Sequence, residues 1–331
     1  MRAAVPPSAS DPSPDDGSSG LVFQFAFTAD GAPAADSSDA VWTWKNYSLT
    51  DARARRAIEQ DLALPEPVRL SLLSNSTACH IDFDDGWVFG ETPDLRHEHY
   101  SEARELGHFR FAFNGSLLIS GRRHPLRSVE AIKRAVASGR RVRSPAALIE
   151  SVVSQSLDHL AVEIAALSDT LDIIEDRIVG DVWHGEREAL TQARRLAVIV
   201  HRQVATVTQL FRHLDQKHDA DLPEETADLA ARLSHRATVL HHDCEQIQAR
   251  ARLLQDELLA KLTAQSNRLL YFLSLLTAVL MPMTIISGLF GMNVGGVPFA
   301  SGQAGFWIVS GLAIVTAALV FVLVTRLGRA A

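Results

Sequence analysis

Cysteine is scarce in this sequence, with two residues, Cys79 and Cys244, among 331. They stand far apart in unlike contexts, which argues against a disulfide framework and favours a reducing compartment. A secretory signal is also missing, because residues 1–20 have no apolar core and are dominated by Pro, Ser, Asp and Gly. We therefore expect residues 1–20 to be a disordered tail and the soluble part of the chain to lie in the cytoplasm.

A basic surface is lacking as well, since the formal net charge is −7 and no Lys/Arg cluster is interleaved with aromatic residues. This composition argues against nucleic acid as a partner and suits a domain that collects cations. The sequence has no Gly-rich phosphate loop, nucleophile elbow or His-Glu-x-x-His motif. We expect neither an enzyme with catalytic residues nor a protein with a bound cofactor.

Charged residues and histidine are absent from two long apolar runs, Leu269 to Phe290 and Phe306 to Thr325. A helix needs about 20 apolar residues to cross the roughly 30 Å hydrocarbon layer of a lipid bilayer. Both runs are long enough, so we expect transmembrane helices over residues 269–290 and 306–325.

Positive charge flanks these two segments on one side only. Lys261 and Arg268 precede the first, Arg326 and Arg329 follow the second, and the loop over residues 291–305 has no charge. By the positive-inside rule, the flanking residues face the cytoplasm and the loop faces out. We expect a multi-pass inner (plasma) membrane protein with cytoplasmic termini, a periplasmic loop over 291–305 and a cytoplasmic tail over 326–331.

Residues 21–145 predict a cytoplasmic α/β domain with a mixed or antiparallel sheet. Alternating apolar runs and turn signals indicate strands within Leu21–Phe27, Val41–Leu49, Ile81–Phe89 and His108–Ile119. Helix formers indicate helices over Asp51–Leu62, stopped by Pro65, and over Ser128–Ala137.

Residues 146–268 have helical periodicity and predict a cytoplasmic bundle and stalk. Two amphipathic helices are expected over Ala146–Val179 and Glu186–Leu214, and a third continues without a breaker until Pro282. A continuous helix from Glu225 to Phe290 would be roughly 100 Å long and would carry the first membrane segment into the cytoplasm.

Apolar residues form a seam along this third helix at spacings of three and four. They are Leu229, Leu233, Ala237, Leu240, Cys244, Ile247, Ala251, Leu254, Leu258 and Leu262. One helix cannot bury such a seam alone. It must pack on the two preceding helices, on copies of itself, or on both.

Small and polar residues share one narrow face of the first membrane segment. Two rows at heptad spacing hold Asn267, Ser274, Met281 and Gly288, and Leu270, Thr277, Thr284 and Gly291. In lipid such a face meets either another helix or water. Pro282 frees a backbone carbonyl in mid-segment, which is tolerable where the carbonyl lines a wet cavity. Two helices cannot enclose a pore, so a channel requires an oligomer.

The triplet Gly291-Met292-Asn293 follows this segment and precedes the last one, with Met281-Pro282 and Thr284 shortly before it. This arrangement resembles the CorA family of divalent-cation transporters. The continuation Val294-Gly295-Gly296-Val297-Pro298 is more similar to the zinc-transporter (ZntB) branch than to the magnesium branch. Magnesium-type members often carry an acidic residue shortly after the triplet, and this loop has none.

The resemblance implies a homopentameric funnel whose first membrane helix lines the pore, with Gly291, Met292 and Asn293 as the ion-recognition mouth. It implies that Asn293 binds the hydrated ion and that Gly291 sets the turn geometry. It also implies rings at Thr284, Met281, Thr277 and Asn267 down the pore. Zinc is the leading transported cation, with magnesium, cobalt, nickel and cadmium as alternatives. A non-transporting membrane-anchored scaffold is the other alternative.

A second candidate metal site lies in the stalk sequence His241-His242-Asp243-Cys244-Glu245. Its residue types bind zinc, and His241 shares a helical face with Glu245. However, Cys244 falls on the apolar seam, where a free cysteine behaves as a small hydrophobic residue. We interpret Cys244 as core packing, with a metal site at His241, His242 and Glu245 as the alternative.

Overall fold

Six strands form one mixed sheet in the computed structural model, which describes residues 20–34, 36–76, 78–95, 106–180, 185–216, 222–292 and 304–327. The strands are β1 (Leu21–Phe27), β2 (Trp42–Ser48), β3 (His80–Asp84), β4 (Trp87–Leu95), β5 (Leu106–Phe113) and β6 (Leu117–Arg122). Their order is β1-β2-β6-β5-β4-β3, and β2 pairs with β6 in parallel while the other neighbours are antiparallel. The predicted mixed sheet is confirmed.

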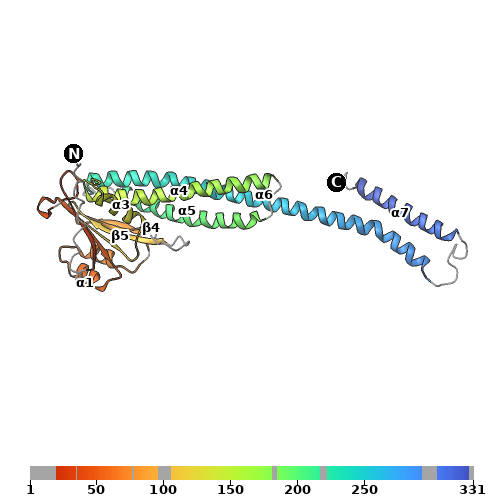
Figure 1. The fold of residues 1–331 in the computed structure, drawn as a ribbon, viewed down its shortest axis with the longest axis horizontal. Coiled ribbons are helices and arrows are strands. Elements are labelled where there is room, and N and C mark those ends of the chain that lie inside the picture. The colour runs from red at the N-terminus through yellow and green to blue at the C-terminus, as the bar shows by residue number, and fades with distance from the viewer. Residues whose placement is uncertain are drawn as a thin grey trace, which may run out of the picture. The chain divides into compact units, whose positions relative to one another are not determined.

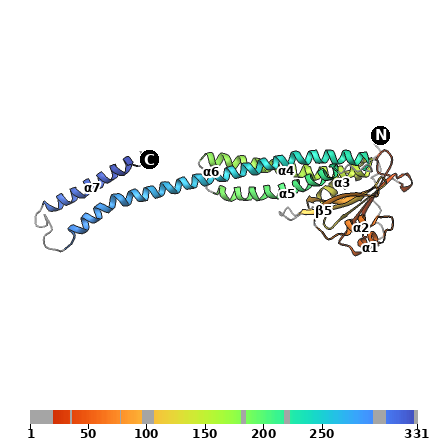
Figure 2. The same ribbon diagram turned by 180° about the vertical axis from the view of Figure 1, so that it is seen from behind.

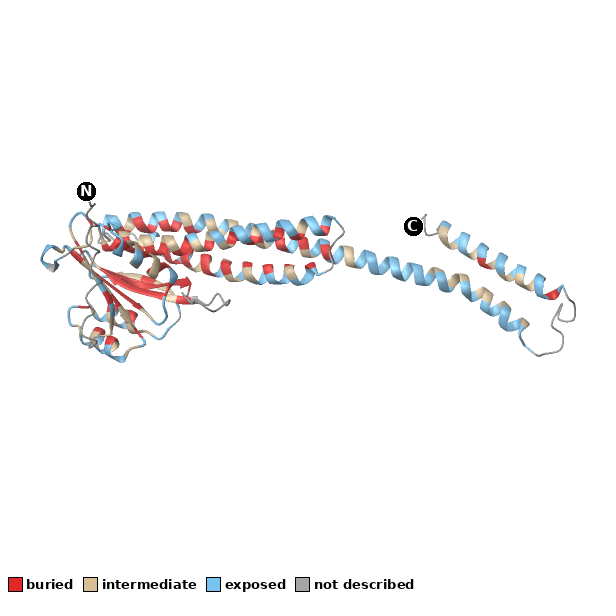
Figure 3. Cartoon of the chain, in the orientation of Figure 1, coloured by how far each residue is buried: buried red, intermediate tan, exposed pale blue. Residues whose placement is uncertain are grey.

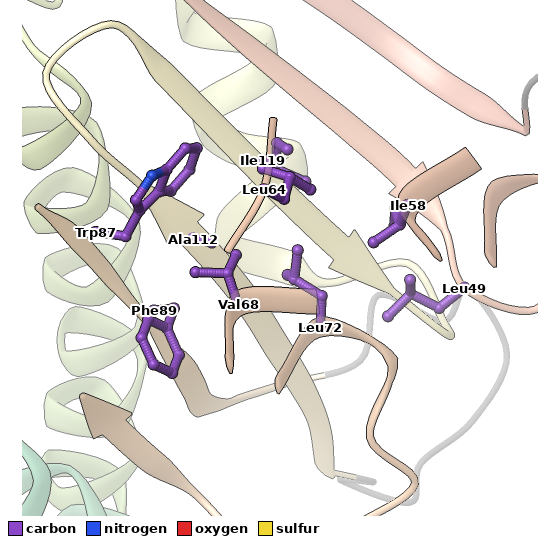
Figure 4. Close-up of a cluster of buried hydrophobic side chains, with 9 residues drawn as sticks. All are labelled: Leu49, Ile58, Leu64, Val68, Leu72, Trp87, Phe89, Ala112 and Ile119. Carbon is purple, nitrogen blue, oxygen red and sulfur yellow. The ribbon is translucent and has the colours of Figure 1, made fainter. Parts of the chain in front are cut away.

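Two short helices cover one face of the sheet, α1 (Ala52–Gln60) and α2 (Glu66–Leu73). Asp51 caps α1 by accepting a hydrogen bond from the Arg53 backbone N–H. Figure 4 shows the core beneath these helices, with α1, α2 and sheet residues pointing toward one another. Its members are Leu49, Ile58, Leu64, Val68, Leu72, Trp87, Phe89, Ala112 and Ile119. The sequence did not predict α2, whose start at Glu66-Pro67 places a proline in the first turn, where it is tolerated.

The other face of the sheet packs on α3 (Arg127–Ala137) and on the start of α4 (Pro145–Val179). Asp94 of β4 links the two layers, because its carboxylate accepts hydrogen bonds from the Ser128 backbone N–H (3.1 Å) and the Ser128 hydroxyl (2.8 Å). The bond to the backbone satisfies an otherwise unpaired N–H in the first turn of α3. Asp94 is 3% exposed, and this burial outweighs the hydrogen bonds and raises its pKa to about 6.

The raised pKa of Asp94 predicts that the folded protein gains stability when this carboxyl is protonated. The contribution of protonated Asp94 to the free energy of unfolding is complete below the unfolded pKa of 3.8 and is lost as the pH rises through about 6. Between about pH 4 and pH 7 the wild type should lose on the order of 3 kcal/mol relative to Asp94→Asn, which cannot ionise. Chemical denaturation of both proteins across this pH range checks the prediction. Parallel stability curves would contradict it.

Three long helices lie side by side in Figures 1 and 2, namely α4, α5 (Glu186–Gln216) and the first part of α6 (Glu224–Phe290). Along the seam of α6, Leu240 and Leu262 are half-buried and the other eight residues are buried. Ion pairs also join α6 to α4, including Arg232 to Glu150 (2.8 Å) and Arg236 to Asp158. The Gln248 amide donates to the Ala197 carbonyl of α5 (3.4 Å). As far as Ala251, the seam therefore packs on the two preceding helices.

The chain divides into two compact units, Met1–Arg252 and Leu253–Ala331. The second unit contains the rest of α6 and the last helix, α7 (Gly305–Leu327). The predicted continuous helix through Pro282 to Phe290 is confirmed. The predicted domain limit at residue 268 stays a prediction.

Both helices of the second unit contain a stretch long and apolar enough to cross a membrane. Figure 3 shows that the buried residues of α6 give way to mainly exposed ones, and the last buried side chain in the described part of α6 is Leu258. Large apolar side chains such as Leu269 (63%), Phe272 (64%) and Leu319 (67%) are exposed. So much apolar surface requires lipid or further protein chains to cover it.

Candidate functional site

The predicted ion-recognition mouth begins where α6 ends, at Phe290. The Gly291 backbone N–H donates to the Ser287 carbonyl (2.9 Å), and a Cβ at Gly291 would lie 2.9 Å from that same oxygen. A side chain at this position would force the backbone of the last turn to move, so the local geometry requires glycine. Met292 follows with 53% of its surface exposed. Asn293 and the continuation Val294 to Pro298 lie outside the described residues.

The six residues predicted to line the pore are exposed in the single chain, and all but Asn267, which comes two residues before it, lie on the membrane segment of α6. They are Asn267, Ser274, Thr277, Met281, Thr284 and Gly288. The Thr277 hydroxyl donates to the Leu273 carbonyl (2.9 Å) and the Thr284 hydroxyl to the Leu280 carbonyl (3.0 Å). Because each hydroxyl gives its hydrogen to its own helix, its oxygen keeps lone pairs to accept hydrogen bonds from water. Each threonine oxygen can thus accept a hydrogen bond from water.

A hollow of about 650 Å³ lies between α6 and α7. Its lining residues are Met283, Thr284, Ser287 and Gly288 of α6 and Ser310, Ala313 and Ile314 of α7. Thr284 and Gly288 therefore lie on the flank of α6 that faces α7, whereas the other four predicted pore residues do not line this hollow. A Cβ at Gly288 would meet nothing within 4 Å, so this flank has room for a neighbouring helix or for water.

The stalk residues His241 and Glu245 lie beside His201 of α5, and the ligand atoms of these three side chains lie within 4.8 Å of one another. His201 is not among the residues predicted from the sequence, and His242 lies outside this group. Cys244 is 3% exposed, and burial, followed by the charge of Asp243, raises its pKa to about 11. The interpretation of Cys244 as part of the packed seam is confirmed.

Residues 39–326 match the family model described as CorA-like Mg2+ transporter protein. The chain belongs to this family. The match runs from the sheet through both candidate membrane helices, and it agrees with the prediction of a transport protein rather than an enzyme.

Relatives in the CorA-like family share both sequence and fold with the chain. The divalent cation transporter CmaX of Pseudomonas aeruginosa is 25% identical over 209 residues, which cover 63% of each protein. The chain thus spans somewhat less than two thirds of that relative. The zinc transport protein ZntB of Photorhabdus laumondii is 24% identical over 265 residues, covering 80% of this chain and 81% of that protein.

Solved structures confirm the predicted fold. A full-length CmaX structure superposes with a TM-score of 0.77 at 21% identity, covering 95% of this chain and 99% of that one. The CorA magnesium transporter of Methanocaldococcus jannaschii gives a TM-score of 0.74 at 15% identity, covering 92% and 98%. The chain therefore has the fold of this family, with an α/β domain, a long helix and two C-terminal candidate membrane helices.

Proposed function

We propose that this protein transports divalent metal cations, zinc first among them, through a homopentameric pore lined by the membrane segment of α6. The observation that carries the proposal is the polar row on this segment, which leads directly into Gly291, Met292 and Asn293 in a chain of the CorA-like family. Relatives named as zinc and divalent cation transporters support the choice of substrate. The magnesium transporter among the structural neighbours favours a magnesium or cobalt channel as the alternative.

An oligomer is needed because one chain offers two membrane helices, which cannot enclose a pore. The exposed apolar surface of α6 and α7 gives neighbouring chains and lipid a surface to cover. In a symmetric ring of five chains, each residue of the polar row repeats at one level. The charge pattern supports an orientation with both termini in the cytoplasm. Tyr271 near the inner end of the first segment and Trp307 near the outer end of the second suit the two interfaces of an inner membrane.

The membrane segments contain no carboxylate, histidine or thiolate. A divalent ion in the pore therefore meets only hydroxyl, amide and carbonyl oxygens and the Met281 thioether. Such dipoles suit a cation that keeps most of its water shell, since full removal of that shell requires charged ligands. The threonine oxygens, which accept hydrogen bonds from the water shell, guide the ion down the pore.

Single cysteine substitutions test the pore. Replacing Ser274, Thr277 or Met281 by cysteine should leave a conducting protein whose zinc flux is blocked by a charged methanethiosulfonate reagent, because the attached group fills the pore. Leu276, 45% exposed and outside the polar row, is the matched control, and flux through Leu276→Cys should be unaffected. Burial raises the pKa of the native thiols Cys79 and Cys244 to about 11, which keeps their background reactivity low.

The positions at which the reagent blocks zinc flux decide between a pore lined by the polar row and the alternatives. Block at the three polar positions and not at Leu276 supports a pore lined by this row. Flux that is not blocked at the three polar positions, or that is blocked equally at Leu276, would contradict a pore lined by this row. Proteins that assemble well and carry no flux before labelling would instead favour the non-transporting scaffold.

A further inference from the structure

We propose that His201, His241 and Glu245 form a transition-metal site that bridges α5 and α6 within one chain. This site would be separate from the transport pathway proposed above and would use different residues. It replaces the stretch His241, His242 and Glu245 suggested by the sequence with a group drawn from two helices.

The geometry of the group is close to that of a metal site. The ligand atoms lie within 4.8 Å of one another, and His241 Nε2 lies 3.7 Å from Glu245 Oε1. With bonds of roughly 2.1 Å, the ligand atoms of a tetrahedral zinc site lie roughly 3.4 Å apart. The His201 and His241 ring centroids are 4.8 Å apart, with 33° between the ring planes. Small rotations of the two rings and of the exposed Glu245 would complete the arrangement.

Buried neighbours pack α5 against α6 around His201, His241 and Glu245, while the three side chains stay accessible to a metal ion. Ala197 and Val204, one turn to either side of His201, are buried, as is Cys244 next to Glu245. His241 Nδ1 is buried and has no hydrogen-bond partner among the described residues. Glu245 is exposed, so an ion and its remaining water ligand can enter from solvent.

The donor set indicates which cations fit. Two imidazoles and one carboxylate suit Zn²⁺, Co²⁺ and Ni²⁺, whereas Mg²⁺ prefers oxygen ligands alone. Three protein ligands leave a fourth position for water. His242 is not part of this set. Its Nδ1 lies 3.7 Å from Glu245 Oε2, whereas His241 lies near the other carboxylate oxygen, Oε1, and the His242 Nε2 lies 3.0 Å from the Gln246 amide nitrogen. A bound ion would tie α5 to α6, the helix that continues into the first membrane segment.

Visible absorption of Co²⁺ bound to the purified full-length protein tests the site, because cobalt held by nitrogen and oxygen in a four-coordinate site absorbs far more strongly than hydrated cobalt. The wild type should bind one cobalt ion per chain with this spectrum. Zn²⁺ should displace the cobalt, and excess Mg²⁺ should not. Glu245→Gln and His201→Gln should each raise the cobalt Kd at least about tenfold.

His235, an exposed histidine on α6 outside the group, gives the matched control His235→Gln, which should bind cobalt as the wild type does. Thermal melting without metal checks folding, and Glu245→Gln should melt like the wild type because Glu245 is exposed. Unchanged cobalt binding in a folded Glu245→Gln variant would overturn the proposal. Loss of binding in His242→Gln but not in His201→Gln would also overturn it, in favour of a site on α6 alone. None of these results depends on transport activity.

Discussion

Asn293→Leu is expected to abolish cation flux while leaving the oligomer mass and the thermal stability near those of the wild type. Leucine has the same branched arrangement of side-chain heavy atoms as asparagine but replaces the amide with methyl groups. If the Asn293 ring binds the water shell of the incoming ion, the variant pore offers that shell no hydrogen bonds at its mouth. Fluorescence measurement of zinc entry into proteoliposomes, with native mass spectrometry of the same sample, checks both parts.

Two outcomes would contradict this role of Asn293. Wild-type flux through the leucine variant would remove the residue from ion recognition. Loss of assembly together with flux would show a structural role instead. Leu289→Ala, four positions before Asn293 and outside the two polar rows, is the matched control and should conduct.

The second large effect is expected from the ion pair buried in the sheet. The side chains of Glu91 and Arg110 are 1% and 5% exposed, with Arg110 Nε 2.6 Å from Glu91 Oε2. His108 Nδ1 lies 2.7 Å from the other Glu91 oxygen, and Arg110 also donates to the Ser76 carbonyl (2.8 Å). Burial would raise the pKa of Glu91, but the hydrogen bonds from His108 and Arg110 outweigh it and lower this pKa. The pair therefore stabilises the fold above the unfolded carboxyl pKa of 4.5, and this contribution is lost as the pH falls through the lowered folded value.

Glu91→Leu should cost about 3–5 kcal/mol, because it leaves the Arg110 charge buried without its carboxylate. The melting temperature of the unit Met1–Arg252, which contains the sheet, should fall by roughly 10 °C, as measured by circular dichroism at neutral pH. The double variant Glu91→Leu/Arg110→Leu should be less destabilised than the single one, because no charge then stays buried. A single variant that melts within a degree or two of the wild type would contradict this account. Arg53→Leu, which removes an exposed ion pair with Asp51, is the control and should have little effect.

The sequence predicted the strands and helices that show a regular spacing of apolar residues. It missed those parts of strands and helices that depend on contacts with distant segments of the chain. The alternation of β1 and β2 and the three-four spacing of the α6 seam were readable because each follows from one face being buried. The strand predicted to end at Phe89 continues as β4 to Leu95, through Pro93. Among the described residues, the pairing of β3 with β4 ends at Glu91, so Pro93 lies where β4 has a partner strand, β5, on one side. Likewise, the first helix ends before Pro65 as predicted, but the start of α2 at Pro65 and Pro67 was not recognised.

The candidate sites divide in the same way. The polar row on the membrane segment follows from heptad spacing along one helix, so the sequence could predict its members. His201 lies 40 positions before His241 on a different helix, and the packing of α5 against α6 is what brings them together. No spacing rule within one helix could have selected His201, whereas His242 was selected only because it is adjacent in sequence.

The most direct test of the central claim is zinc and magnesium flux into proteoliposomes containing the purified wild-type protein, measured against protein-free liposomes. The account predicts zinc entry that a large excess of magnesium does not suppress. Magnesium entry without zinc entry would assign the pore to the magnesium channel alternative. No flux of either ion through fully assembled oligomers would contradict transport by this protein altogether.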